Sequence, residues 1–218
     1  MAKPSRHAVL AALLERDGRT YSDELGIDIE KGTPSPLFRW LCASLLFSAR
    51  ISAELAVQAA AALAKQGWTT PQKLADATWK ERVRTLNEAG YARFDERTAT
   101  MLGDTCEILL DRYRGDLRRL REEAEREPKR ERSLLKELKG IGDVGVDIFF
   151  REAQAAWVEL RPFADRRALD AAKRLELGRD AEALADLVSE RELPRLVAAL
   201  VRTELADDYD GVRDAAAR

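Results

Sequence analysis

The sequence predicts an all-α fold made of ten or eleven short helices, and two observations support this. Hardly any segment alternates apolar and polar residues between turn signals, as half-buried strands do. Apolar residues instead recur three and four positions apart, between residues that typically cap or end helices. The connecting segments are short, which favours antiparallel packing of neighbouring helices within a chain of 218 residues.

In the first half of the chain, a helix is expected over residues 5–16, and the Gly- and Pro-containing residues 17–36 predict a loop. Residues 36–50 are apolar almost all round, which predicts a buried central helix. Later helix starts are marked by a capping residue or an acid. These starts are Ser52, Thr70, Thr78 and Asp95, with the last helix running to about residue 113.

In the second half, a charged helix over residues 117–124 should be broken by Pro128. A short helix over 133–138 and another over 143–154 flank two closely spaced glycines. Three more helices are expected after residue 165, and the acidic residues 204–218 should fray.

Composition excludes several classes of protein. The net charge is -2, so any basic surface must be local. We find no apolar run long enough to cross a membrane and no secretory signal. A single histidine and two distant cysteines argue against a Cys/His metal site. Cys42 and Cys106 are therefore interpreted as reduced core thiols of a cytoplasmic protein.

The segment Lys139-Gly140-Ile141-Gly142 predicts a tight hairpin between two helices. Ile141 would act as an apolar plug, and the helix that follows would present free backbone N–H groups. Such a helix start favours an anion, and a backbone contact with phosphate holds DNA without reading its sequence. The alternative is an ordinary turn between two helices.

Asp165 is an isolated carboxylate about twenty residues after the hairpin, directly before a helical pattern. By itself it predicts a helix N-cap. The order of hairpin, short helix, apolar segment and aspartate is uncommon, however, and it indicates a functional carboxylate.

These segments resemble the helix-hairpin-helix DNA glycosylase superfamily, of which endonuclease III is a well-known type. Residues 138–142 are similar to its Leu-Pro-Gly-Val-Gly motif, and Ala164-Asp165 to its apolar residue and aspartate. "LLFSARIS" and "AGYARFDERTATM" resemble two further family segments in the right order. The resemblance covers about residues 36–177.

The resemblance implies two helical lobes with a cleft between them. A six-helix barrel would span residues 31–158 and carry the helix-hairpin-helix unit at about 134–154. Residues 1–30 and 159–218 would form the second lobe, with Asp165 facing the hairpin across the cleft.

The resemblance also implies an activity, namely excision of a damaged or mismatched base from double-stranded DNA in base-excision repair. Bifunctional members carry a lysine where this chain has Val144, and no cysteine follows Cys106 to hold an iron–sulfur cluster. The expected enzyme is therefore a monofunctional DNA glycosylase, monomeric and associated with the nucleoid, that needs no cofactor.

Site residues follow from the same resemblance. Asp165 would stabilise the developing positive charge on the sugar and orient or deprotonate the attacking water. DNA contacts are expected from the hairpin and from residues at wedge or phosphate positions, namely Lys139, Gly140, Ile141, Gly142, Val144, Arg50, Tyr91 and Arg166. Family hairpins also hold a monovalent cation, here through the carbonyl oxygens of Lys136, Leu138 and Ile141.

Two alternatives stay open. The acidic composition and Arg166-Arg167 after the aspartate suit a non-catalytic DNA-binding or lesion-sensing protein. A bifunctional glycosylase that uses another amine, such as that of Lys139, is the second alternative. The aromatic residues Trp40, Trp79 and Trp157 are expected in the core.

Overall fold

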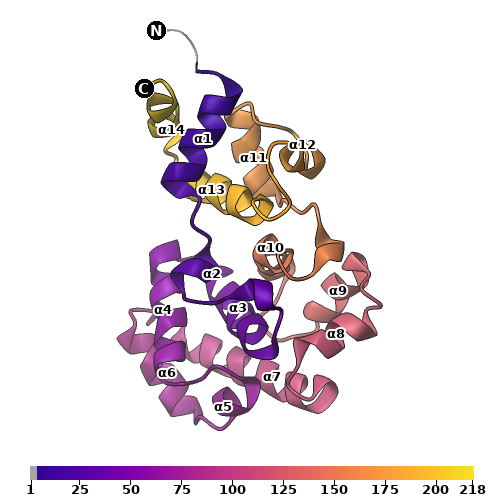
Figure 1. Ribbon diagram of the computed structural model, residues 1–218. Helices are drawn as coiled ribbons and strands as arrows, with labels where there is room; N and C mark the ends of the chain where they lie inside the picture. Colours follow the sequence, from indigo (N-terminus) through magenta and orange to yellow (C-terminus); the bar gives the residue numbers. More distant parts are fainter. Residues whose placement is uncertain (1–3) are drawn as a thin grey trace. The chain divides into compact units, whose positions relative to one another are not determined.

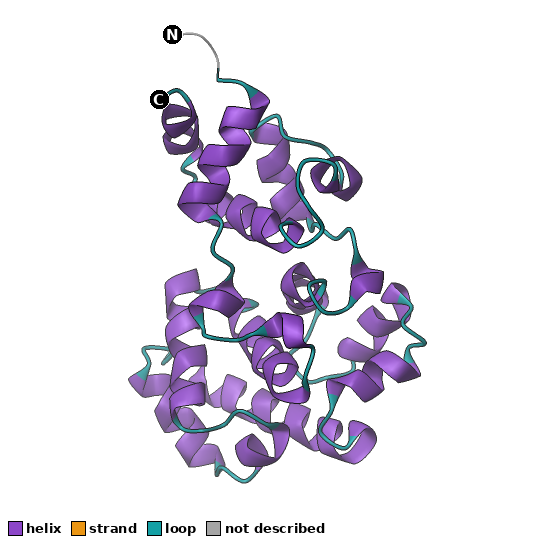
Figure 2. Cartoon of the chain, in the orientation of Figure 1, coloured by secondary structure: helices purple, strands orange, loops and turns teal. Residues whose placement is uncertain are grey.

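The structure is a computed structural model that describes residues 4–218, and these residues form helices with no strand (Figure 2). This confirms the all-α prediction. The first helices are α1 (Arg6–Asp17), α2 (Tyr21–Glu24), η1 (Ile29–Lys31), α3 (Pro34–Phe47), α4 (Ala53–Lys65), α5 (Pro71–Ala75), α6 (Trp79–Glu88) and α7 (Asp95–Tyr113). The others are α8 (Leu117–Glu123), α9 (Pro128–Leu135), α10 (Asp143–Ala153), η2 (Val158–Leu160), α11 (Arg166–Arg174), α12 (Ala181–Ala185), α13 (Leu193–Ala206) and α14 (Tyr209–Ala216).

The chain divides into two compact units. We call Leu25–Glu159 the central unit, and Met1–Glu24 with Leu160–Arg218 the terminal unit. The first boundary precedes Leu25, earlier than the expected residue 31, because α2 packs on the terminal unit. Arg202 of α13 forms an ion pair with Glu24 and lies 3.9 Å from the centre of the Tyr21 ring.

The terminal unit is built around α13, whose buried face contacts α1 and α11, while α14 packs on α1 (Figure 1). Its core combines leucine, valine and alanine side chains from both ends of the chain. Alanines on the buried face of α11 let this helix approach α13 closely. These core residues include Leu10, Leu13, Ala168, Ala171, Ala172, Val197, Leu200 and Val212.

The central unit is organised around α3, which is buried along most of its length as its composition predicts. It contacts α4, α8 and α10. The indole Nε1 of Trp40 donates a hydrogen bond of 3.0 Å to the carbonyl oxygen of Phe149, which joins α3 to α10. Trp40 and Trp157 are core residues as expected, and both cysteines are buried and free. Burial raises the pKa of Cys106 to about 12.

Local caps explain why several helix starts were predictable. The side chains of Ser52, Thr70 and Thr78 each accept a hydrogen bond from a backbone N–H in the first turn of the following helix. The backbone N–H of Thr78 in turn donates to the carboxylate of Glu81, which completes a capping box. The long helix α7 has the predicted bounds, and it ends before Gly115, whose φ is 74°.

Four predictions about elements were wrong. Residues 17–36 contain α2 and η1 rather than only loop, because tertiary contacts hold these short turns. The helix expected over residues 133–138 begins earlier, because α9 starts at Pro128 and proline fits the first helical turn. Four helices follow Asp165, not three, and α14 occupies the segment expected to fray. Its Tyr209 and Val212 are buried, and Asp208 caps it.

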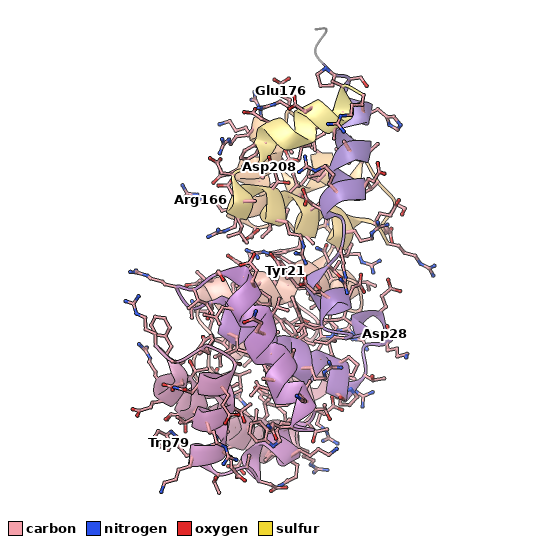
Figure 3. The ribbon with its side chains drawn as sticks, turned by 90° about the vertical axis from the view of Figure 1, so that its left-hand side faces the viewer. Tyr21, Asp28, Trp79, Arg166, Glu176 and Asp208 are labelled. Atoms are coloured by element: carbon pink, nitrogen blue, oxygen red, sulfur yellow. The ribbon has the colours of Figure 1, made fainter. Side chains whose placement is uncertain are left out.

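Trp79 was also expected in the core, and this prediction was wrong. Its side chain is 41% exposed at the surface of α6 (Figure 3). Its indole N–H donates to the hydroxyl of Thr100 at 3.0 Å, so this ring lies across α6 and α7 rather than beneath them.

Candidate nucleic-acid interface

The hairpin between α9 and α10 turns at Gly140, whose φ is 83°. A Cβ atom here would lie 2.8 Å from the sulfur of Met101 and 3.0 Å from Cδ1 of Leu45. Both the backbone conformation and the packing therefore require glycine. Gly142, the other glycine of the hairpin, does not need this freedom. Its φ of -98° is open to any residue, and a Cβ would meet nothing within 4 Å.

Contacts with α7 and α10 hold the hairpin on the central unit. Ile141 is buried, as expected of a plug, and its side chain packs beside Gly145. The hydroxyl of Thr105 in α7 donates a hydrogen bond of 2.8 Å to the carbonyl oxygen of Lys139. The backbone of the turn is thus held in place while the side chain of Lys139 stays exposed.

The first turn of α10 forms an exposed helix start. Gly142 is the N-cap residue and provides no side-chain capping bond, and residues 142–144 are all exposed. Backbone N–H groups in the first turn have no partner within their own helix, and together with the helix dipole they favour an anion. Val144 is 58% exposed here, so the first turn of α10 presents an apolar side chain beside its free N–H groups.

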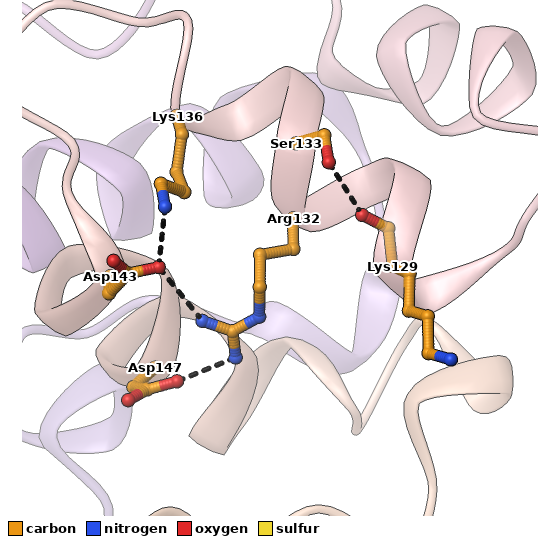
Figure 4. A network of polar contacts seen from close by, with 6 residues as sticks. All are labelled: Lys129, Arg132, Ser133, Lys136, Asp143 and Asp147. Carbon is orange, nitrogen blue, oxygen red and sulfur yellow. Dashed lines mark hydrogen bonds and ion pairs between the residues drawn. The ribbon is translucent and has the colours of Figure 1, made fainter.

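Ion pairs join the two helices beside this helix start (Figure 4). Lys136 Nζ lies 2.7 Å from the carboxylate of Asp143, and Arg132 lies 2.6 Å from Asp147 and 3.9 Å from Asp143. The hydrogen bond from Lys136 and the nearby Arg132 lower the pKa of Asp143. Lys136 and Arg132 are therefore cations whose charge is partly used within the protein.

This ion-pair network was not predicted as a group. The sequence does contain its signal, because basic residues end α9 and acidic residues begin α10, and a tight turn brings those two ends together. Which cation pairs with which carboxylate depends on the angle between the helices, and a local pattern does not specify that angle.

Asp165 lies in the terminal unit and is the N-cap of α11. Its Oδ1 accepts a hydrogen bond of 3.2 Å from the backbone N–H of Ala168, and the residue is 9% exposed. The helix behind it is anchored in the core by Ala168 and Ala171. The structure therefore gives Asp165 the capping role that its position predicts, on a rigidly packed helix start.

The other predicted DNA contacts differ in accessibility. Arg50 and Arg166 are exposed, and the Arg166 side chain extends away from α11 (Figure 3). Tyr91 is only 1% exposed, and its hydroxyl donates 3.3 Å to the carbonyl oxygen of Leu46. Tyr91 was expected among the DNA contacts, and this is wrong in the structure because its ring is part of the core.

The expected cation ligands are backbone oxygens of the hairpin. The carbonyl oxygen of Leu138 accepts the N–H of Ile141 at 3.2 Å, and an oxygen in such a turn retains a second lone pair. Among residues 4–218, no group of three or more His, Cys, Asp or Glu side chains is arranged to hold a metal ion. Within the same residues, no helix is both long and apolar enough to traverse a bilayer.

Comparison with known proteins finds similar solved structures but no related sequence. No family model and no curated protein matches this chain. A solved non-covalent endonuclease III–DNA complex is similar with a TM-score of 0.50 at 19% identity, over 78% of this chain and 72% of that chain. A trapped endonuclease III–DNA covalent intermediate is similar with a TM-score of 0.48 at 19% identity, over 75% and 71% of the two chains.

The first of these likenesses shows that the chain has an endonuclease III-like all-α fold. At this level of identity the likeness concerns the fold alone.

Proposed function

We propose that this protein binds duplex DNA through its hairpin and excises a damaged or mismatched base as a monofunctional DNA glycosylase. The observation that supports this most is the exposed start of α10 in an endonuclease III-like fold. The tightly packed turn at Gly140 holds this helix start in place. Backbone N–H groups at a rigid helix start can bind a DNA phosphate whatever the base sequence. Lys139, exposed on the same turn, adds a charge that phosphate attracts.

Asp165 is the proposed catalytic residue. In hydrolysis, a water oxygen bonds to the sugar C1′ while the C1′–N bond breaks, and the base leaves with the bonding electron pair. The carboxylate stabilises positive charge on the sugar and accepts the proton lost by the water. The target base has to leave the helical stack first. Val144 in place of an amine supports a reaction without a covalent protein–sugar intermediate.

A second candidate function is favoured by the burial of Asp165. A carboxylate that is 9% exposed and already caps α11 suits a structural role, which supports a DNA-binding protein without catalysis. In that case the hairpin would still bind duplex DNA, while no base would be released.

Base release from duplexes carrying uracil, an oxidised pyrimidine, an alkylated purine or A·8-oxoguanine distinguishes the two. Asp165→Asn removes the charge and keeps the cap, because asparagine caps helices as well as aspartate does. A matched control is Asp180→Asn, since Asp180 caps α12 in the same unit by accepting 2.8 Å from Ala183.

We expect release by the unaltered protein and by the Asp180 variant, and its loss in Asp165→Asn at unchanged duplex affinity. Equal binding by all three proteins without product on any lesion would support the second candidate. Trapping of a covalent adduct by borohydride would instead indicate an amine nucleophile. The candidate for this amine is Lys139 in the hairpin.

A further inference from the structure

A basic groove runs along the exposed side of α11 in the terminal unit. It is lined by Arg166, Leu169, Asp170, Lys173 and Arg179. The first four residues lie at positions i, i+3, i+4 and i+7 of the helix, and therefore on one face. The opposite face is fixed in the core by alanines, so the groove is presented by a rigid helix.

The charges of this groove are mostly unneutralised. Three cations face one carboxylate, in a chain whose net charge is -2. Arg166 is 3.6 Å from Asp170, but this pair is solvent-exposed, with 95% of the Arg166 side chain accessible. Exposed pairs of this kind contribute little to stability, so Arg166 can exchange its partner at little cost. Lys173 and Arg179 have no ion-pair partner within residues 4–218 and are exposed.

We propose that this groove is a second contact for the sugar–phosphate backbone of duplex DNA, separate from the hairpin. This rests on the proposed function, since DNA is the polyanion that it provides. From Arg166 to Lys173 the helix rises about 10 Å, and such a length of duplex presents about three phosphates of one strand. The two groove cations of α11, Arg166 and Lys173, therefore span the same length as this row of phosphates.

The groove favours a nucleic-acid backbone over a lipid surface or exposed bases. Its one apolar side chain, Leu169, packs against the core of the terminal unit. The large exposed apolar residues of the described chain are Trp79, Val144, Val158 and Leu205, and none lines this groove. A site with charges and no exposed apolar wedge can hold phosphates but cannot insert into a bilayer or stack on a base.

The test measures the affinity of the full-length protein for an undamaged duplex over a series of salt concentrations. The groove variant is Lys173→Glu with Arg179→Glu. The charge-matched control is Arg191→Glu with Arg218→Glu, two exposed arginines of the same unit outside the groove. Lys139→Glu serves as the hairpin variant. All five altered side chains are exposed, so the fold should persist, and circular dichroism checks this.

We expect the groove variant to bind at least about tenfold more weakly at about 50 mM salt, with its salt dependence reduced by about two ions. The control should stay close to the unaltered protein. If the groove variant binds normally while Lys139→Glu weakens binding, the groove proposal is wrong and the hairpin proposal stands. If the control loses as much as the groove variant, only overall charge matters and the groove is not a contact.

Failure of the unaltered protein to bind any duplex would overturn the proposed function and the groove together. Binding of the unaltered protein and the groove variant to phosphatidylserine vesicles is measured as well. Vesicle binding that the groove variant loses, with duplex binding unchanged, would assign the groove to a lipid surface and overturn the DNA contact.

Discussion

Lys136 Nζ lies 2.7 Å from the carboxylate of Asp143, so an ion pair bridges the two sides of the turn at Gly140. Asp143 is also the first residue of α10, where a carboxylate is stabilised by the helix dipole. The position that favours a DNA phosphate thus already holds a negative charge of the protein. A bound phosphate has to share Lys136 and the helix start with this side chain.

Removing that charge should strengthen DNA binding. In Asp143→Asn, Lys136 loses its partner at 2.7 Å and becomes available to phosphate. We expect about a threefold gain in duplex affinity at about 50 mM salt, with a steeper salt dependence. Asp28→Asn is the control, since Asp28 pairs with Lys31 on the surface of the same unit. Equal affinities for the two variants would show that Asp143 does not compete with DNA.

Lys139 should contribute to affinity and not to sequence preference. Its side chain is exposed on the hairpin while its carbonyl is bound to Thr105. Lys139→Glu should weaken binding about tenfold for every duplex tested and lower the salt dependence by about one ion. Lys80→Glu, on the exposed side of α6, matches the charge change. Unchanged binding by Lys139→Glu at low salt would mean that the hairpin does not hold phosphate.

The two hairpin glycines should respond differently to alanine. Gly140→Ala places a Cβ 2.8 Å from the Met101 sulfur at a φ of 83° and should cost about 3 kcal/mol of stability. Gly142→Ala meets nothing within 4 Å at an ordinary φ and should change stability by less than about 1 kcal/mol. Thermal unfolding of both proteins measures this. A similar loss in the two variants would contradict the geometry of the turn.

Glu131 should make the stability of the protein depend on pH. Its side chain is fully buried near Glu159, which is itself paired with Arg121. Burial and the neighbouring carboxylate raise the pKa of Glu131 to about 8. Ionised Glu131 finds no hydrogen-bond donor among the described residues, whereas protonated Glu131 can donate to Glu159.

The folded state therefore binds this proton more tightly than the unfolded state does. The free energy of unfolding should fall as the pH rises from about 4.5 to about 8 and should be lowest above that range. Glu131→Gln keeps a donor without the charge, so it should remove this slope and stabilise the protein by about 3 kcal/mol at high pH. The control is Glu30→Gln, an exposed glutamate of the same unit. A slope that persists in Glu131→Gln would assign it to other groups.

Local sequence signals predicted most helix starts because capping is a short-range interaction. Ser52, Thr78 and Asp165 each bond to a backbone N–H only three residues away, so their sequence neighbours determine the outcome. The turn at Gly140 was predictable for the same reason, since its positive φ is a property of one residue.

Features that depend on distant residues were not predictable. Tyr91 lies in the connection between α6 and α7, and it is buried where its hydroxyl reaches the carbonyl oxygen of Leu46 in α3. The segment after residue 204 is ordered because α14 packs on α1, at the other end of the sequence. Lys173 shares a helix face with Arg166 by its spacing, but only the fold of the terminal unit places Arg179 beside them.

The terminal unit takes helices from both ends of the chain, whereas the central unit is one uninterrupted segment. During translation, α1 emerges long before α13 and α14, the helices on which it packs. Its apolar side, with Leu10 and Leu13, must therefore remain uncovered until α13 and α14 have been synthesised. A premature stop after Glu159 would remove the helices that cover α1, so the apolar side of α1 would stay exposed to solvent.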